Sequence, residues 1–278
     1  MQSAVTISLV KEARGGPFVF WDDLPGACQK AAELGFDAVE IFPPSAQAIA
    51  ASVVRPLLDA HSLKLAAVGT GAGWVIHRLT LTSADAPTRQ RARDFIRSII
   101  DAAGALGAPA IIGSMQGRWA DGVDCDAAMH HLEAALSDLG EHAKQLGVPL
   151  IYEPLNRYET NLINTLSEGV ALLGTLKTDN VKLLADLFHL NIEETDIAGA
   201  LREAADHVGH IHLADSNRRP ATCGHTDFAS IARALAEIGY RGYVSAECLP
   251  YPDSEKAAAT TIAAFRKYFA VEKPDGPH

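Results

Sequence analysis

The sequence predicts an α/β protein that forms a single (β/α)8 TIM barrel, and three observations lead to this fold class. Eight short runs of β-forming residues are separated by longer stretches with helical periodicity. Several of these runs follow a glycine that would end the preceding helix. The length of 278 residues is near the roughly 250 residues typical of one such barrel. We therefore expect one domain over residues 1–278.

The first four predicted strands occupy residues 4–10, 38–42, 64–70 and 109–115. The second and the fourth follow helix-ending glycines, in the sequences AELGFDAVEIF and GALGAPAII. Strands that are separated by helices run parallel, because each crossover brings the chain back to the same edge of the sheet. Both faces of these strands are apolar, as in a sheet that helices cover.

The last four predicted strands occupy residues 149–154, 181–187, 210–215 and 242–247. The first and last of them again follow a glycine, in KQLGVPLIY and AEIGYRGYVSAE. The alternative fold is an open doubly wound sheet, which usually has fewer strands and often a glycine-rich phosphate loop after the first. Residues 11–16 read KEARGG and lack the G-x-G-x-x-G spacing, which favours the barrel.

Composition and charge exclude several classes of protein. The formal net charge of −10 argues against nucleic-acid binding, which usually needs a basic face. No run approaches the roughly 20 apolar residues that span a bilayer, and the N-terminus lacks the basic start of a signal peptide. The four cysteines form no C-x-x-C pair, so we expect buried, reduced thiols. These observations predict a cytoplasmic protein without a membrane partner.

Four metal-capable side chains lie on the last four predicted strands: Glu153, Asp186 and Glu247 at the strand ends, and His212 within its strand. Catalytic groups of a barrel lie at the C-terminal ends of its strands. Taken singly, each residue would more often be a helix cap, a surface charge or a hydrogen-bonded core histidine. Together, three carboxylates would repel one another without a cation. Three oxygens and one imidazole suit Mn²⁺, Mg²⁺ or Co²⁺, so we expect one divalent ion.

Other polar residues allow two interpretations each. Glu159, His189 and Arg218 follow the strand ends on loops, where they would bind a hydroxylated substrate or simply face solvent. Glu40 ends the second predicted strand and would position the substrate or a metal-ligand partner, or be a buried carboxylate bonded to backbone. We expect no metal ligation by Cys248, which strand alternation turns away from Glu247.

His130 and His131 lie in a predicted helix between the fourth and fifth strands. We expect them on the outer ring of helices, without a function.

The segments EPLNRYETNLINT, LLADLFHLNIEE, GHIHLADSNRRP and YVSAE together resemble the xylose-isomerase-like barrel superfamily. Within it the chain is most similar to ketose 3-epimerases of the D-tagatose and D-psicose type. The resemblance is specific from about residue 152 to 247. It implies metal ligation by Glu153, Asp186, His212 and Glu247. It also implies substrate binding by Glu159, His189 and Arg218.

The activity that this resemblance implies is a divalent-metal-dependent isomerisation or epimerisation of a small ketose, with Mn²⁺ as the first candidate ion. An enediolate would form, with Glu153 and Glu247 as acid and base on opposite faces. We expect a carbohydrate as the partner molecule, and a homodimer or homotetramer as a candidate assembly. Three loops depart from the family pattern: Ser8–Val10, the segment GSMQGRW, and Pro220–Gly224. Because these loops shape the pocket, the chemistry can hold while the substrate differs.

Other functions remain open at this point. A lyase that dehydrates a keto-inositol would need the same ion and the same enediolate. An apurinic-site endonuclease on this barrel would need additional histidines and a D-x-H pair, whereas residues 225–227 read His-Thr-Asp and neither His61 nor His77 has a clear ligand position. A sugar-binding protein without catalysis would not need two opposed glutamates.

Overall fold

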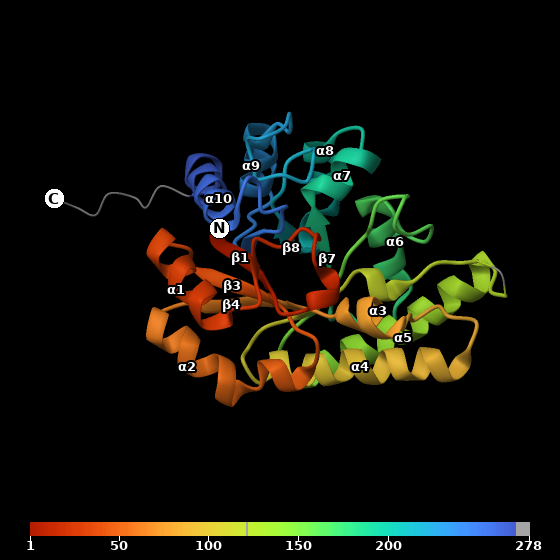
Figure 1. Ribbon diagram of the computed structural model, residues 1–278. Coiled ribbons are helices and arrows are strands. Elements are labelled where there is room, and N and C mark those ends of the chain that lie inside the picture. Colours follow the sequence, from red (N-terminus) through yellow and green to blue (C-terminus); the bar gives the residue numbers. More distant parts are fainter. Residues whose placement is uncertain (121, 271–278) are drawn as a thin grey trace.

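The computed structural model describes residues 1–120 and 122–270, and its strands form one closed parallel barrel. The strand order is β2-β1-β3-β4-β5-β6-β7-β8-β9, and an additional pairing of β1 with β9 closes the sheet. Helices surround the strands (Figure 1). The prediction of a (β/α)8 TIM barrel is therefore confirmed. The strands are β1 (Gln2–Ser8), β2 (Phe20–Trp21), β3 (Ala38–Phe42), β4 (Lys64–Gly69), β5 (Ala110–Ile112), β6 (Leu150–Tyr152), β7 (Val181–Asp186), β8 (Val208–His212) and β9 (Tyr243–Ala246).

Strand β2 is an addition to the eight barrel strands, and the sequence analysis did not predict it. It has two residues and pairs with the end of β1, with Ile7 opposite Phe20 and Ser8 opposite Trp21. Two residues are too few to produce a recognisable periodicity. The strand holds the loop after β1 close to the barrel mouth.

The α-helices of the described residues follow the strands as predicted. Four of these helices are followed by the glycine that was predicted to end them. Gly35, Gly107, Gly147 and Gly239 have φ between 71° and 80°. The residue after each glycine donates its N–H to the carbonyl five residues back, which is the Schellman arrangement. The α-helices are α1 (Leu24–Leu34), α2 (Ala51–His61), α3 (Ala72–His77), α4 (Ala86–Gly104), α5 (Cys125–Gln145), α6 (Leu166–Thr175), α7 (Leu187–Glu193), α8 (Ile197–Ala204), α9 (Phe228–Glu237) and α10 (Ser254–Tyr268).

The observed strands are shorter at their ends than the predicted ones. The predicted strand 109–115 contains only the three residues of β5, and the 3-10 helix Ser114–Gln116 begins two residues later. Likewise, β8 ends at His212, although the prediction extended to residue 215. The apolar sequence continues past the point where the backbone leaves the sheet, because loop residues at the mouth of the barrel are also buried.

Alternation along the strands places an apolar layer and a polar layer inside the barrel. Outward-facing side chains pack under the helices in the main core. The inward-facing residues Ala67, Ile111, Ile151 and Leu184 form a separate apolar cluster in the interior. Two residues further along β6 and β7 come Glu153 and Asp186. The apolar layer therefore forms the floor beneath a polar layer at the C-terminal ends of the strands.

Three remaining expectations concern the chain as a whole. Cys28 and Cys248 are buried, but Cys125 and Cys223 are exposed, so the expectation of buried thiols is wrong for these two. In the part of the chain that the structure describes, no helix combines the length and apolar character needed to cross a bilayer. The single domain predicted over residues 1–278 includes residues 271–278, which lie outside the described residues, and it stays a prediction.

Candidate active site

The structure brings Glu153, Asp186, His212 and Glu247 together at the C-terminal mouth of the barrel, and we call these four residues the rim cluster. Each offers one ligand atom, and the four atoms all lie within 4.8 Å of one another. Asp186 and His212 are the last residues of β7 and β8 and lie opposite each other in the sheet. Glu153 and Glu247 directly follow β6 and β9. The cluster thus spans four neighbouring strands, with the two glutamates at its ends.

The imidazole of His212 is oriented so that one nitrogen faces the three carboxylates. Its Nε2 lies 3.0 Å from Glu40 Oε1 on the side of the barrel interior. Its Nδ1 is buried and has no hydrogen-bond partner, although oxygens of Glu247, Asp186 and Glu153 lie 3.3, 3.6 and 3.7 Å away. This buried, unpartnered nitrogen and the three carboxylates together form a donor set that suits a divalent ion of the Mn²⁺ or Mg²⁺ type.

Burial and charge set the protonation of the cluster. Burial raises the pKa of Glu153 to about 7, with Glu247 and Asp186 adding to the rise and His212 opposing it. Burial acts in the same direction on Asp186, but Arg218 and His189 hold the pKa of this carboxyl well below its usual range. The crowded carboxylates therefore need positive charge close by, as a bound cation would provide.

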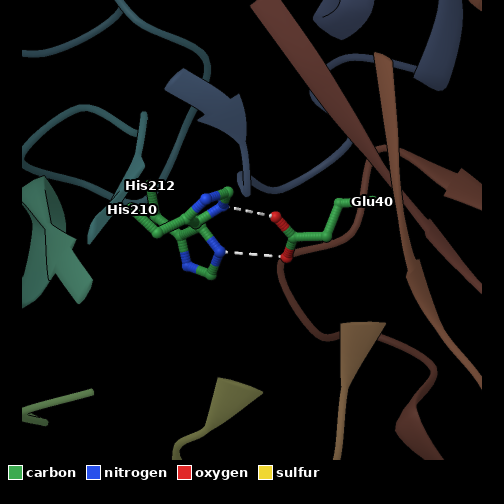
Figure 2. A group of neighbouring side chains, drawn as sticks. All are labelled: Glu40, His210 and His212. Atoms are coloured by element: carbon green, nitrogen blue, oxygen red, sulfur yellow. Dashed lines mark hydrogen bonds and ion pairs between the residues drawn. The ribbon is translucent and has the colours of Figure 1, made fainter. Parts of the chain in front are cut away.

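Glu40 lies inside the barrel on β3 and hydrogen-bonds two histidines of β8. Its Oε2 is 2.8 Å from His210 Nε2, and its Oε1 is 3.0 Å from His212 Nε2 (Figure 2). Burial disfavours its ionisation, yet His212 and His210 hold the pKa of the Glu40 carboxyl well below its usual range. The expected alternative of a carboxylate bonded to backbone is wrong, because both oxygens bind side chains from the opposite wall.

His189 and Glu159 lie beside the rim cluster, and Asn156 connects them. His189 Nε2 is 3.7 Å from Asp186 Oδ2 and 3.8 Å from Glu153 Oε1. Its Nδ1 accepts from the side-chain amide of Asn156 at 2.7 Å, and the same amide donates to Glu159 Oε1 at 3.0 Å. The sequence analysis missed Asn156, although it begins the NRYETN segment. Its bonds direct the Nε2–H of a neutral His189 toward the cluster.

Arg218 reaches the rim cluster from the loop after β8. Its guanidinium donates to Asp186 Oδ2 at 2.8 Å and also to Glu247 Oε2, and it lies over the Phe188 ring at 4.7 Å. The residue has a φ of 61°, in the left-handed region that non-glycine residues rarely adopt. Strained backbone of this kind often accompanies a functional position. All three residues with predicted substrate roles thus lie at the mouth of the barrel.

A cavity of about 320 Å³ opens above the cluster. The polar residues Glu153, Glu247, Glu159, His189 and Arg218 line it. It is also lined by apolar side chains from the N-terminal half of the chain, which we call the apolar wall: Pro17, Phe18, Phe42, Trp74 and Val75. The volume is at the lower end of the range for ligand pockets, about 300–1,000 Å³, which fits a small molecule.

The apolar wall and a glycine were missed by the sequence analysis. Phe18 and Phe42 stack with ring centroids 4.6 Å apart, but they are 24 positions apart in the sequence and no periodicity connects them. Gly113 follows β5, and a Cβ at this position would collide with Glu153 Oε2. The close approach of Glu153 to the backbone there therefore requires glycine.

Several other residues that could in principle bind a metal lie away from the rim cluster. Cys248 is buried, with Sγ 3.9 Å from Thr261 Oγ1 of α10, so it points away from Glu247 as predicted. His130 and His131 lie on α5 in the outer ring of helices. Among the described residues, two groups of three or more candidate ligands are close enough to share an ion: Glu40, His210 and His212, and the rim cluster. Neither includes the histidines that an endonuclease would recruit from positions 61, 77 or 225.

Comparison with known proteins agrees with this geometry. The model of the family described as xylose isomerase-like TIM barrel matches residues 28–268. The chain belongs to this family. A D-psicose 3-epimerase of Ruminiclostridium cellulolyticum is 31% identical over 246 residues, which cover 83% of this chain and 81% of that protein. The resemblance to the xylose-isomerase-like superfamily is therefore confirmed.

Further members of the family have related names. An L-ribulose 3-epimerase of a Methylomonas species is 29% identical over 240 residues, covering 85% of this chain and 82% of that protein. A crystal structure of a D-allulose 3-epimerase from Methylomonas is 26% identical, covers 96% of this chain and 98% of that one, and has a TM-score of 0.81. These relatives are isomerase-class enzymes, as the sequence analysis expected. The roles of individual site residues stay predictions.

Proposed function

We propose that this enzyme epimerises an unphosphorylated ketose at the carbon next to the carbonyl, with Glu153 and Glu247 as the two acid–base groups. The observation that carries the proposal is the arrangement of the rim cluster. The carboxylates of Glu153 and Glu247, which follow the outer two of the four neighbouring strands, lie beside the unpartnered Nδ1 of His212 at the floor of a small cavity. Relatives named as 3-epimerases of ketoses support the reaction class.

The rim cluster would hold one divalent ion through three carboxylate oxygens and His212 Nδ1, with Mn²⁺ as the first candidate and Mg²⁺ or Co²⁺ as alternatives. When bound, this ion supplies a Lewis acid that polarises the ketone of the sugar. Glu153 and Glu247 directly follow β6 and β9, the two outer strands of the four, so their carboxylates would approach the substrate from different sides. One removes the proton next to the carbonyl to give an enediolate, and the other returns a proton to the opposite face, which inverts the carbon.

His189, Glu159 and Arg218 would hold the sugar hydroxyls. The Nε2–H of His189 and the guanidinium of Arg218 are donors at the cluster, and Glu159 is an acceptor at the cavity wall. Arg218 is the one lysine or arginine among the described residues that line the cavity, and two carboxylates already engage it. Among the lining side chains that the structure describes, no further lysine or arginine is left for a phosphate, which favours a free sugar.

Proton exchange in D₂O tests the proposed function. The Mn²⁺-loaded enzyme should introduce deuterium at C3 of a free ketose such as D-psicose, D-tagatose or L-ribulose, and NMR should show the inverted product. The corresponding sugar phosphates should react at least tenfold more slowly. Exchange followed by loss of water would identify an enediolate lyase instead. Binding of sugars without any exchange would contradict an enzymatic role.

Removal of the substrate-orienting side chains should weaken binding and slow the chemistry together. For Arg218→Ala and His189→Ala we expect a higher KM and a kcat lower by about 10–100-fold, because misplacing a substrate by 1 Å can cost about 10² in rate. Steady-state kinetics on the best ketose measure both values. Arg157→Ala and His142→Ala are matched controls, since these side chains pair with Glu193 and Asp101 and do not line the cavity. Unchanged kinetics for Arg218→Ala would contradict its role.

A further inference from the structure

The side chain of Glu40 extends from β3 to the opposite side of the barrel, where its carboxylate meets His212 of the rim cluster. Glu40 belongs to β3, whereas His210 and His212 belong to β8, about 170 positions later in the chain. All three side chains point into the barrel, and all are at least 96% buried. Figure 2 shows the two imidazoles converging on the two oxygens of the carboxylate. We call Glu40, His210 and His212 the interior triad.

The pattern of donors and acceptors in the interior triad determines where His212 carries its proton. An ionised carboxylate only accepts hydrogen bonds. The 3.0 Å contact between His212 Nε2 and Glu40 Oε1 therefore requires a proton on Nε2. A neutral His212 then has its lone pair on Nδ1, which is the buried nitrogen that faces Glu153, Asp186 and Glu247 without a partner.

His210 has a distinct part in this arrangement. It is two residues before His212 on β8, so both side chains point to the same face of the strand. Its Nε2 lies 2.8 Å from Glu40 Oε2, the oxygen that His212 does not use. The two rings are nearly perpendicular, at 83°. With both oxygens engaged from different directions, the carboxylate cannot rotate away from His212.

We propose that Glu40, held by His210, is a positioning residue that fixes the tautomer and ring orientation of His212 for metal binding. The proposal rests on the proposed function in that it assumes a divalent ion at the rim cluster. Carboxylates that accept from the second nitrogen of a ligating histidine are a general means of orienting such ligands, and their loss typically costs 10–100-fold in metal affinity. The hydrogen bonds of the Glu40 carboxylate go to His210 and His212, so its effect on the bound ion would pass through His212.

Glu40→Met tests this role because methionine fills a similar volume and removes both acceptors. We expect the dissociation constant for Mn²⁺, measured by calorimetry without sugar, to rise about 10–100-fold. Glu40→Gln should lose less, because its amide oxygen can still accept from one imidazole. Saturating Mn²⁺ should restore most of the turnover of Glu40→Met, a recovery that a general folding defect would not show. Glu194→Met is the matched control: Glu194 accepts from the Leu166 backbone N–H and lies outside both groups of candidate ligands.

The outcomes separate this inference from the proposed function. If the dissociation constant of Glu40→Met for Mn²⁺ is within about twofold of the wild-type value, the inference is overturned, whether or not the proposed sugar chemistry is correct. If Glu40→Met does not fold, ¹⁵N NMR of the wild type loaded with diamagnetic Mg²⁺ gives the answer. The inference requires a protonated Nε2 on His212, and a proton on Nδ1 alone would refute it. Wild-type protein that binds no divalent ion would overturn both proposals.

Discussion

Glu153→Gln and Glu247→Gln should each lower turnover by about 10²–10⁴, the usual contribution of general acid–base catalysis. This loss corresponds to about 2.7–5.4 kcal/mol in activation free energy. The amide oxygen of glutamine can still bind a cation, so each variant should keep much of its Mn²⁺ affinity. The amide cannot take up a proton usefully, so the chemical step should fail while the site remains. Calorimetry with Mn²⁺ and steady-state kinetics on the same preparations measure the two properties separately.

The two glutamine variants need not fail in the same way. A variant that lacks only the proton-returning acid can still exchange the substrate proton with D₂O while it forms little epimer. A variant that lacks the proton-removing base should do neither. Comparison of exchange and epimer formation therefore assigns the two roles. If both variants bind Mn²⁺ normally and turn over at the wild-type rate, the two-base mechanism is wrong.

Chelation of the divalent ion should reduce turnover by at least about 10³, because a Lewis acid supplies several kcal/mol of transition-state stabilisation. The ion should also stabilise the fold, since Glu153, Asp186 and Glu247 have oxygens within 4.8 Å of one another. At a free ion concentration 100 times the dissociation constant, binding adds about 2.7 kcal/mol to the free energy of unfolding. For a chain of 278 residues that corresponds to a melting temperature higher by about 4–5 °C.

To check this prediction, the turnover and the melting temperature of chelator-treated enzyme are measured while Mn²⁺, Mg²⁺ or Co²⁺ is added back. The ion that restores turnover at the lowest concentration identifies the preferred metal. His212→Phe is a useful comparison, because it removes the single nitrogen of the rim cluster, and its thermal stability should respond much less to added ion. Full turnover after exhaustive chelation would rule out metal-dependent chemistry.

The sequence was most informative where a polar residue follows an apolar run. Glu153, Asp186 and Glu247 end such runs and His212 lies within one, and parallel strands in a barrel present their C-terminal ends at one mouth. The position of each residue along its own strand was therefore enough to predict that the four would meet. The helix-ending glycines 35, 107, 147 and 239 were visible for a similar local reason.

Features that depend on distant segments could not be predicted in this way. Glu40 meets His210 and His212 because the closed sheet places β3 opposite β8. The sequence of one strand does not predict which strand lies opposite it in the barrel. The same holds for Phe18 and Phe42 in the apolar wall. Strand β2 is held by its pairing with Ile7 and Ser8 rather than by any pattern of its own.

The pairing of β1 with β9 has a consequence for how the enzyme is made. Gln2 and Val5 lie opposite Tyr243 and Ala246, so β1 is synthesised before the strand that it pairs with to close the barrel. Until β9 is synthesised, residues 2–5 of β1 and the facing edge of β8 lack the strand that pairs with them, and Glu247 is missing from the mouth. Exposed strand edges promote aggregation of nascent chains. Assembly of the active site and protection of the growing chain therefore both depend on the synthesis of β9.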